Sequence, residues 1–331
     1  MLTAFVRAFQ TPDLRKKLLI TLGLIALFRF GASLPTPGIS EKNVAFCSNA
    51  AAQGSTAGVL AIVNLLSGQA LLRLSVFALG IMPYITASII LQLLTVVIPR
   101  LETLKQEGQA GQAKITQYTR YLTVGLAVLQ STGYVELAKS GTLFNGCGAS
   151  GTANPLIPNA STFTIATMVI TMVAGTTVIM WMGELITDRG VGNGMSVLIF
   201  TSIAARIPGE GGNILRTRGG FIFTMVCLLG LAIIAAVVFV EQAQRRIPVQ
   251  YAKRMAGRTM FAGQATYFPM KVNTSGVIPP IFAGAILSFP ATLGNWLPGL
   301  ATVQHALESN AWLYDGVFVL LIIFFTYFYT T

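Results

Sequence analysis

The sequence has little charge, almost no histidine and few cysteines. Lys, Arg, Asp and Glu together make up 10% of its 331 residues, and there is one histidine, His305. A single histidine excludes a histidine-based metal cluster. The sequence also lacks a nucleophile and base pair, a phosphate-binding loop and a paired-carboxylate site of the kinds that mark enzymes. We therefore expect neither an enzyme nor a metal or organic cofactor.

The three cysteines do not suggest catalysis. Cys227 falls inside an apolar stretch, where a small packing residue is expected. Cys47 and Cys147 fall in segments that we assign below to outer loops, where oxidation can occur. Both a disulfide between them and two separate thiols remain open at this stage.

What the sequence has in abundance is apolar residues. They make up 53% of the chain, and the mean hydropathy is +0.69. A membrane helix needs about 20 consecutive, mostly apolar residues, and eight stretches qualify, although the fifth is short. The composition therefore predicts an all-α membrane protein, a multi-spanning helical bundle. The expected spans are 18–34, 75–97, 122–138, 163–182, 195–207, 221–240, 272–289 and 313–331.

The basic residues orient this bundle. With the N-terminus inside, fifteen Lys and Arg residues fall in inner segments and six in outer ones, which matches the positive-inside rule. Arg29 lies within the first span, where we expect its side chain to snorkel toward the outer surface. Before that span, Leu2, Phe5, Val6 and Phe9 share one helical face, and Thr11-Pro12 is a helix-start signal. The pattern favours a short surface helix on the inner side over a frayed tail.

The inner loop at about 242–271 is long, basic and partly aromatic. About thirty residues are far more than a simple connection needs, and alternating apolar residues from Ile247 to Tyr251 suggest a small projecting hairpin. One interpretation is positive-inside topology with binding of anionic lipids. The other, which the length and aromatic content favour, is docking of a large acidic partner such as ribosomal RNA or an acidic protein. The basic residues proposed for docking are Arg245, Arg246, Lys253, Arg254 and Arg258.

Two further segments bear on the architecture. Gly190, Gly192 and Gly194 permit a tight turn between the fourth and fifth spans, and without a preceding strand they do not indicate a nucleotide site. Between Val59 and Val97 an apolar stretch is broken at Ser67-Gly68-Gln69 and carries polar residues in its second half. Polar groups in lipid are costly unless they are satisfied, so this broken span suggests a chain that lines a path.

Two stretches of the sequence are highly distinctive, SVFALGIMPYITASIILQLL (75–94) and WMGELITDRGVGNGMSVLIF (181–200). Both closely resemble the signature segments of the SecY family of bacterial protein-translocation channels. Weaker matches are KQEGQAGQAKITQYTRY, AQRRIPVQYAKR and YFPMKVNTSGVIPPIFA, in family order across the whole chain. The resemblance implies a bundle of two inverted-repeat halves, here 1–207 and an incomplete 208–331. The family has ten spans, and this chain ends within the eighth.

The resemblance also implies roles for named residues. A ring of apolar side chains would seal the channel, and the matching positions, called the ring residues below, are Ile81, Ile85, Met195, Ile199 and Ile278. A lateral gate would carry polar side chains that hydrogen-bond across its closed seam. The matching residues, called the seam amides below, are Gln92, Gln130 and Asn273. Residues 58–66 match the plug, a short helix seated in the outer funnel. Ser67, Gly68 and Gln69, which we call the joint, would let the plug swing away.

The function implied is that of a passive channel in the bacterial plasma membrane. It would pass unfolded secretory chains, recognise signal sequences and nascent chains, and release transmembrane segments sideways into lipid. The resemblance implies the small subunits SecE and SecG, the SecA ATPase and the ribosome as partners. The alternative is a secondary transporter, which also uses inverted repeats, but the few acids near spans lie toward their ends. A lipid scramblase or a structural anchor would leave the basic loop unexplained.

Overall fold

The computed structural model describes most of the chain. The described residues are 11–52, 68, 70–141, 155–249, 254–256, 259–261, 266–273, 275–276, 279–280, 282–284, 286–287 and 311–330. The chain divides into two compact units, one made of Met1–Pro208 with Gly284–Phe318 and the other of Gly209–Ala283 with Val319–Thr331. The expected surface helix, the segment 58–66, Ser67, Gln69, Cys147, Lys253, Arg258 and Ile278 lie outside the described residues.

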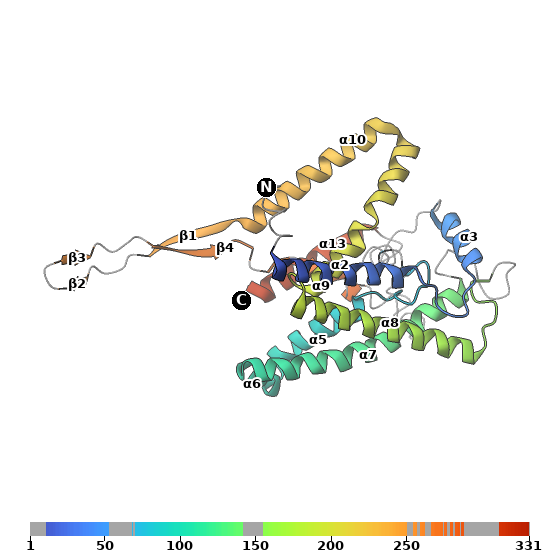
Figure 1. The fold of residues 1–331 in the computed structure, drawn as a ribbon, viewed down its shortest axis with the longest axis horizontal. Helices are drawn as coiled ribbons and strands as arrows, with labels where there is room; N and C mark the ends of the chain where they lie inside the picture. The colour runs from blue at the N-terminus through green and yellow to red at the C-terminus, as the bar shows by residue number, and fades with distance from the viewer. Residues whose placement is uncertain are drawn as a thin grey trace. The chain divides into compact units, whose positions relative to one another are not determined.

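The described elements are mainly helices (Figure 1). They are α2 (Pro12–Ser33), α3 (Glu41–Ala52), α5 (Met82–Val97), α6 (Pro99–Gln106), α7 (Gln109–Ser140), α8 (Thr162–Arg189), α9 (Gly194–Ala204), α10 (Ile207–Gln242) and α13 (Ala311–Thr330). Four short strands follow α10: β1 (Gln244–Val249), β2 (Arg254–Ala256), β3 (Thr259–Phe261) and β4 (Thr266–Lys271). The all-α prediction is confirmed.

Local sequence explains where several helices begin and end. Thr11 precedes α2 and Pro12 opens it, as the start signal predicts. The side chain of Ser161 accepts a hydrogen bond from the Thr164 amide at the start of α8. At the end of α7, Gly141 adopts a left-handed conformation, with φ 73°. The proline after Ile98 ends α5, and α6 leaves it at an angle of 100°.

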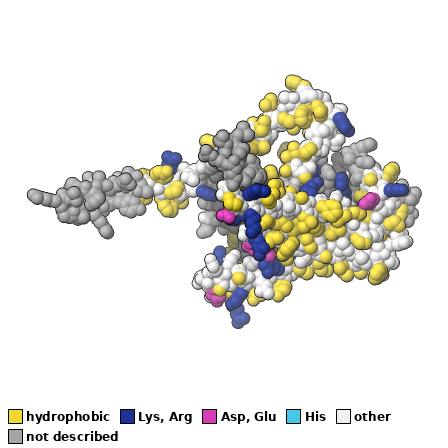
Figure 2. All heavy atoms as spheres, in the orientation of Figure 1, with side chains coloured by type: hydrophobic (Ala, Val, Ile, Leu, Met, Phe, Trp, Pro, Cys, Tyr) yellow, Lys and Arg dark blue, Asp and Glu magenta, His cyan; other side chains and the backbone are white. Residues whose placement is uncertain are grey.

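Fewer than eight of the described helices are both long enough and apolar enough to qualify as membrane spans. Two helices are long and apolar enough to cross a membrane, α8 and the Gly211–Gln242 part of α10, and the bent α5–α6 pair makes a third if it is counted as one span. The 32-residue α7 is long enough, but Gln130, Ser131 and Glu136 lower its hydropathy. Hydrophobic side chains nevertheless cover much of the helical surface (Figure 2), which suits helices in lipid.

The predicted second span needs a correction. We expected a helix from Ser75 to Val97, but the chain forms successive turns up to Ile81 and becomes α-helical at Met82. Leu74 and Gly80 have positive φ values of 47° and 56°, which interrupt a regular helix. The turn segment 70–81 instead pairs with the end of α2, because Val76 donates its amide hydrogen to the Leu34 carbonyl.

The core of the first unit lies where α3, the turn segment, α7 and α8 meet. Its buried side chains include Leu71, Leu74, Leu79, Tyr134, Val135, Leu137, Leu156, Ile157, Met168 and Met172. Cys47 is also buried in this cluster and is disulfide-bonded, whereas Cys227 is an exposed free thiol. Cys147, its expected partner, lies outside the described residues.

Candidate functional site

Four of the five ring residues meet in one apolar cluster. Ile81 is buried, and Ile85, Met195 and Ile199 are partly buried and pack against the same core. Ile81 and Ile85 come from the adjoining turn segment and α5, whereas Met195 and Ile199 come from α9, more than a hundred residues later in the sequence. The buried part of the cluster also includes Phe28, Ala32, Ala70, Phe77, Ile179, Met182, Ile186 and Leu198.

The turn segment is fixed to α2 by backbone bonds and by an aromatic contact. Thr36 donates both its amide and its hydroxyl hydrogen to the Leu74 carbonyl, at 3.1 and 2.7 Å. The ring of Phe77 stacks on that of Phe28, with centroids 6.0 Å apart, and it lies directly against Gly31. These contacts set the position from which Ile81 enters the cluster.

The turn from α8 to α9 is as tight as its glycines predict. Asn193 caps α9, because its Oδ1 accepts hydrogen bonds from the amides of Met195 and Ser196 at 3.0 and 3.4 Å. The Thr187 hydroxyl oxygen accepts a further bond from the Gly194 amide at 2.9 Å. α9 is only 11 residues long, as the short fifth span predicts. The backbone of Met195 is therefore anchored at both flanking positions.

The seam amides lie in different surroundings. Gln130 on α7 is buried, with 7% of its surface exposed, whereas Gln92 on α5 is exposed. Asn273 belongs to the other unit, where its Nδ2 donates to Glu241 Oε1 at 3.1 Å. Its Oδ1 accepts from the Ser275 hydroxyl and the Gly276 amide. The hydrogen bonds expected between the three amides remain a prediction.

Gly68 is the described member of the joint. It is buried and left-handed, with φ +64°. A methyl group on it would come 3.3 Å from Arg29 Nη1 and 3.3 Å from Ser202 Cα. The sequence suggested only that Arg29 snorkels, and it gave no sign that this guanidinium lies beside the joint.

The basic loop forms an exposed two-stranded ribbon that continues from α10 (Figure 1). Its antiparallel register pairs Arg246 with Pro269 and Ile247 with Phe268. Since side chains alternate between faces, one face carries Gln244, Arg246, Pro248, Tyr267, Pro269 and Lys271. The other carries Arg245, Ile247, Val249, Phe268 and Met270.

The two faces of the ribbon differ in character. On the first, the Arg246 guanidinium lies 4.9 Å from the centre of the Tyr267 ring, a cation–π contact. On the second, Phe268 and Met270 are 61% and 45% exposed. Arg254 lies on β2, which pairs with β3. The predicted hairpin is present, and it offers a partner both positive charge and apolar surface.

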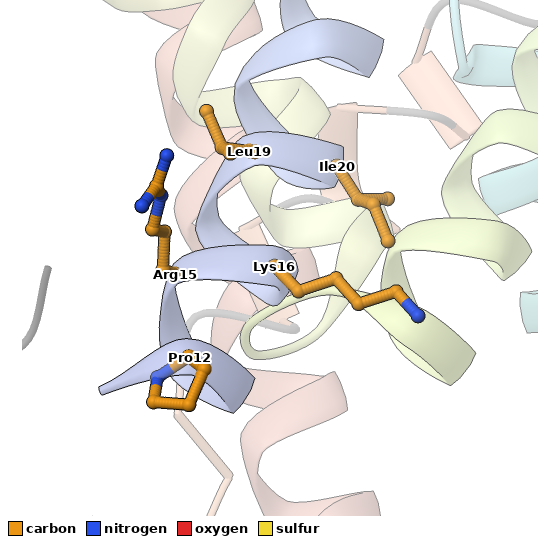
Figure 3. Close-up of a pocket in the computed structure, with 5 residues that line it drawn as sticks. All are labelled: Pro12, Arg15, Lys16, Leu19 and Ile20. Carbon is orange, nitrogen blue, oxygen red and sulfur yellow. The ribbon is translucent and has the colours of Figure 1, made fainter. Parts of the chain in front are cut away.

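A surface pocket at the start of α2 also combines charge with apolar side chains. Pro12, Arg15, Lys16, Leu19 and Ile20 line it. In Figure 3, Arg15 and Leu19 extend to one side of the helix, and Lys16 and Ile20 to the other. Cations next to apolar groups at a membrane surface suit an anionic lipid, which has a phosphate and acyl chains.

Comparison with known proteins gives strong sequence matches. A family model described as SecY matches residues 75–331. The chain is 53% identical to the protein translocase subunit SecY of Mycobacterium tuberculosis (strain H37Rv) over 343 residues, which covers 100% of this chain and 76% of the relative. It is 57% identical over 341 residues to that of Streptomyces scabiei, covering 99% and 76%.

Two solved channels have a similar fold. A structure described as that of a protein conducting channel matches with a TM-score of 0.53 and 18% identity, over 87% of this chain and 58% of the other. Sec61 in the canine ribosome-channel complex from the endoplasmic reticulum matches with a TM-score of 0.52 and 17% identity, over 87% and 59%. The chain thus spans under two thirds of these channels, and at such identities the likeness concerns the fold.

Proposed function

The chain belongs to the SecY family of protein translocase subunits, and from this we propose that it forms the path by which unfolded secretory chains cross the bacterial plasma membrane. A solved protein-conducting channel shares its fold, and relatives at 53% and 57% identity are protein translocase subunits. In our proposal it is a passive conduit, not an enzyme, and it also releases transmembrane segments sideways into lipid.

The observation that carries this proposal is the cluster of ring residues. Ile81, Ile85, Met195 and Ile199 reach one apolar cluster from separate segments of the chain. A narrow apolar constriction excludes ions by dewetting and yet can yield around a passing polypeptide. Ile278 would complete the ring. Methionine at position 195 adds a flexible side chain, which suits a seal that must deform.

Lateral release would use the seam amides Gln92, Gln130 and Asn273. Each interhelical hydrogen bond in a membrane contributes about 0.6 kcal/mol, which is weak enough for an apolar signal sequence to displace. The buried position of Gln130 on α7 supports a polar contact within the bundle. Residues 58–66 would be the movable plug, with Ser67, Gly68 and Gln69 as its joint.

The channel needs partners to drive transport. We propose that SecA or the ribosome docks on the basic ribbon through Arg245, Arg246, Lys253, Arg254 and Arg258. The exposure of Arg245 and Arg246, and of Phe268 and Met270, supports this. SecE and SecG would complete the channel. The N-terminus would face the cytoplasm, with anionic lipids at the pocket lined by Arg15 and Lys16. The alternative, a secondary transporter, is not favoured, because the matched relatives are translocase and channel subunits.

A reconstitution experiment tests the proposal. The chain is assembled with SecE and SecG in vesicles, and resting ion flux and SecA-driven uptake of a secretory precursor are measured. We expect precursor uptake, and Ile85→Asn should raise the resting ion flux several-fold. Val96→Asn is the control, since Val96 lies on the same helix and is 62% exposed. Absence of uptake by the assembled complex, or equal ion flux in the two variants, would overturn the proposal.

A further inference from the structure

The helix α8 is approached closely by its neighbours at glycines. Gly175 lies against the backbone carbonyl of Val76 in the turn segment, and Gly190, just after α8, lies against the Thr21 side chain of α2. Gly183 lies against the start of α9. Backbones approach this closely only where no side chain separates them. The turn segment, which carries Ile81, and α9, which carries Met195 and Ile199, are therefore packed directly on α8.

Gly183 has two neighbours on α9. Its carbonyl oxygen lies so close to Gly194 that a methyl group there would overlap it. A methyl group on Gly183 itself would overlap the sulfur of Met195 and come 2.8 Å from its Cε. Leu198 is farther away, with its Cδ1 at 3.5 Å from the same point. The space that a side chain at position 183 would fill is thus occupied by the Met195 thioether.

The backbone around Met195 leaves little freedom to relieve such an overlap. The Thr187 hydroxyl donates to the Gly183 carbonyl at 2.9 Å, and its oxygen accepts from the Gly194 amide at 2.9 Å, so it bridges α8 and α9. Asn193 holds the Met195 amide at 3.0 Å. A group added at position 183 must therefore displace the Met195 side chain rather than the helix. Rotation about the bonds of the flexible methionine side chain costs less energy than moving the hydrogen-bonded backbone.

We propose that Gly183 is a positioning residue of the ring: it provides the space against α8 in which the Met195 thioether lies, and so decides how far this side chain extends from α9. The inference rests on the proposed ring function of Met195. Its side chain reaches Gly183 through Sδ and Cε, two atoms that valine lacks. The effect of a methyl group at position 183 therefore depends on which residue occupies position 195.

This dependence gives a double-mutant test. Gly183→Ala, Met195→Val and the double variant are prepared in the full chain, assembled with SecE and SecG in vesicles. Gly125→Ala is the matched control, because Gly125 also lies within a helix and a methyl group there meets nothing within 4 Å. The readouts are resting ion flux and the NMR signal of a ¹³C-labelled Met195 methyl group, assigned by its loss in Met195→Val.

We expect Gly183→Ala to shift the Met195 methyl signal and to change the resting ion flux several-fold. Gly125→Ala should do neither, and adding Gly183→Ala to Met195→Val should change the flux by less than twofold. An unshifted methyl signal in Gly183→Ala would overturn the inference, as would equal effects of Gly183→Ala with either residue at position 195. A shifted signal with unchanged flux in every variant would instead overturn the ring role of Met195 in the proposed function.

Discussion

Arg120 on α7 forms two parallel hydrogen bonds with Glu184 on α8, from Nε to Oε1 and from Nη2 to Oε2, both at 2.8 Å. These bonds raise the pKa of the Arg120 guanidinium, so its charge persists at every accessible pH. Glu184 directly follows Gly183, so these bonds join α7, which carries Gln130, to α8, on which α9 packs. Nothing in the sequence spacing suggested the pair, which is 64 residues apart.

Replacing Arg120 with lysine should loosen this connection. Lysine keeps the charge but cannot form the two-pronged contact. Because 48% of the Arg120 side chain is exposed, we expect a modest loss of about 0.5–1 kcal/mol in the free energy of unfolding. Thermal unfolding of the purified chain in mild detergent measures it. Lys114→Gln is the control, since Lys114 and Glu107 are 3.7 Å apart and at least half exposed. Equal effects of both variants would contradict the prediction.

Removing the cap of α9 should destabilise the turn that carries Met195. Asn193→Ala loses two hydrogen bonds to the amides of Met195 and Ser196, and the loss of such a cap costs about 1 kcal/mol. Asn193→Asp keeps an acceptor oxygen and should recover most of this stability. Hydrogen exchange at the Met195 and Ser196 amides checks the local effect. The exchange rate should rise in the alanine variant and not in the aspartate variant. Equal exchange in the two variants would argue against the cap.

Periodicity and signature segments predicted most of the fold. Hydrophobic runs located α2, α7, α8 and α10, and the glycines of residues 190–194 predicted the turn that begins α9. The alternating apolar residues after Arg246 predicted the ribbon. These features depend on residues close together in the sequence, where side-chain pattern and backbone preference act on the same few turns.

What could not be predicted depends on partners far apart in the sequence. The helical prediction for residues 75–81 was wrong because the segment just after α2 forms hydrogen bonds with the turn segment, as between Thr36 and Leu74, and these outweigh its apolar pattern. The contacts of Asn273 with Glu241, and of Arg120 with Glu184, likewise arise only when distant segments pack. No local periodicity encodes such contacts.

The contact of Asn273 with Glu241 should couple the base of the ribbon to the chain that follows it. Asn273 bonds Glu241 at the end of α10 and also holds the Ser275 hydroxyl and the Gly276 amide. We expect Glu241→Ala and Asn273→Ala each to destabilise the chain, and a double-mutant cycle on the free energy of unfolding to give a coupling of about 1 kcal/mol. Purely additive effects would mean that the hydrogen bond contributes nothing.

Reversing charge on the ribbon should weaken partner docking in a salt-dependent way. We expect Arg245→Glu with Arg246→Glu to lower the affinity for SecA or ribosomes at low salt, and to flatten the dependence of affinity on salt concentration. Phe268→Ser, which removes an exposed apolar side chain without changing the charge, should lower affinity with the salt dependence unchanged. Vesicle cosedimentation at several salt concentrations separates the two effects. Equal salt dependence in all variants would mean that the ribbon cations do not contact the partner.

Substituting Gly31 with alanine should displace the turn segment from α2. A methyl group at this position would overlap the ring of Phe77, which also stacks on Phe28. Overpacking of this kind costs about 1–3 kcal/mol, more than the roughly 1 kcal/mol that alanine gains over glycine in a helix. Gly23→Ala on the same helix meets nothing within 4 Å and should be neutral or stabilising. Since Ile81 follows Phe77 by one turn, Gly31→Ala should also raise resting ion flux, whereas Gly23→Ala should not. Stability and flux unchanged in Gly31→Ala would show that Phe77 does not hold the turn segment in place.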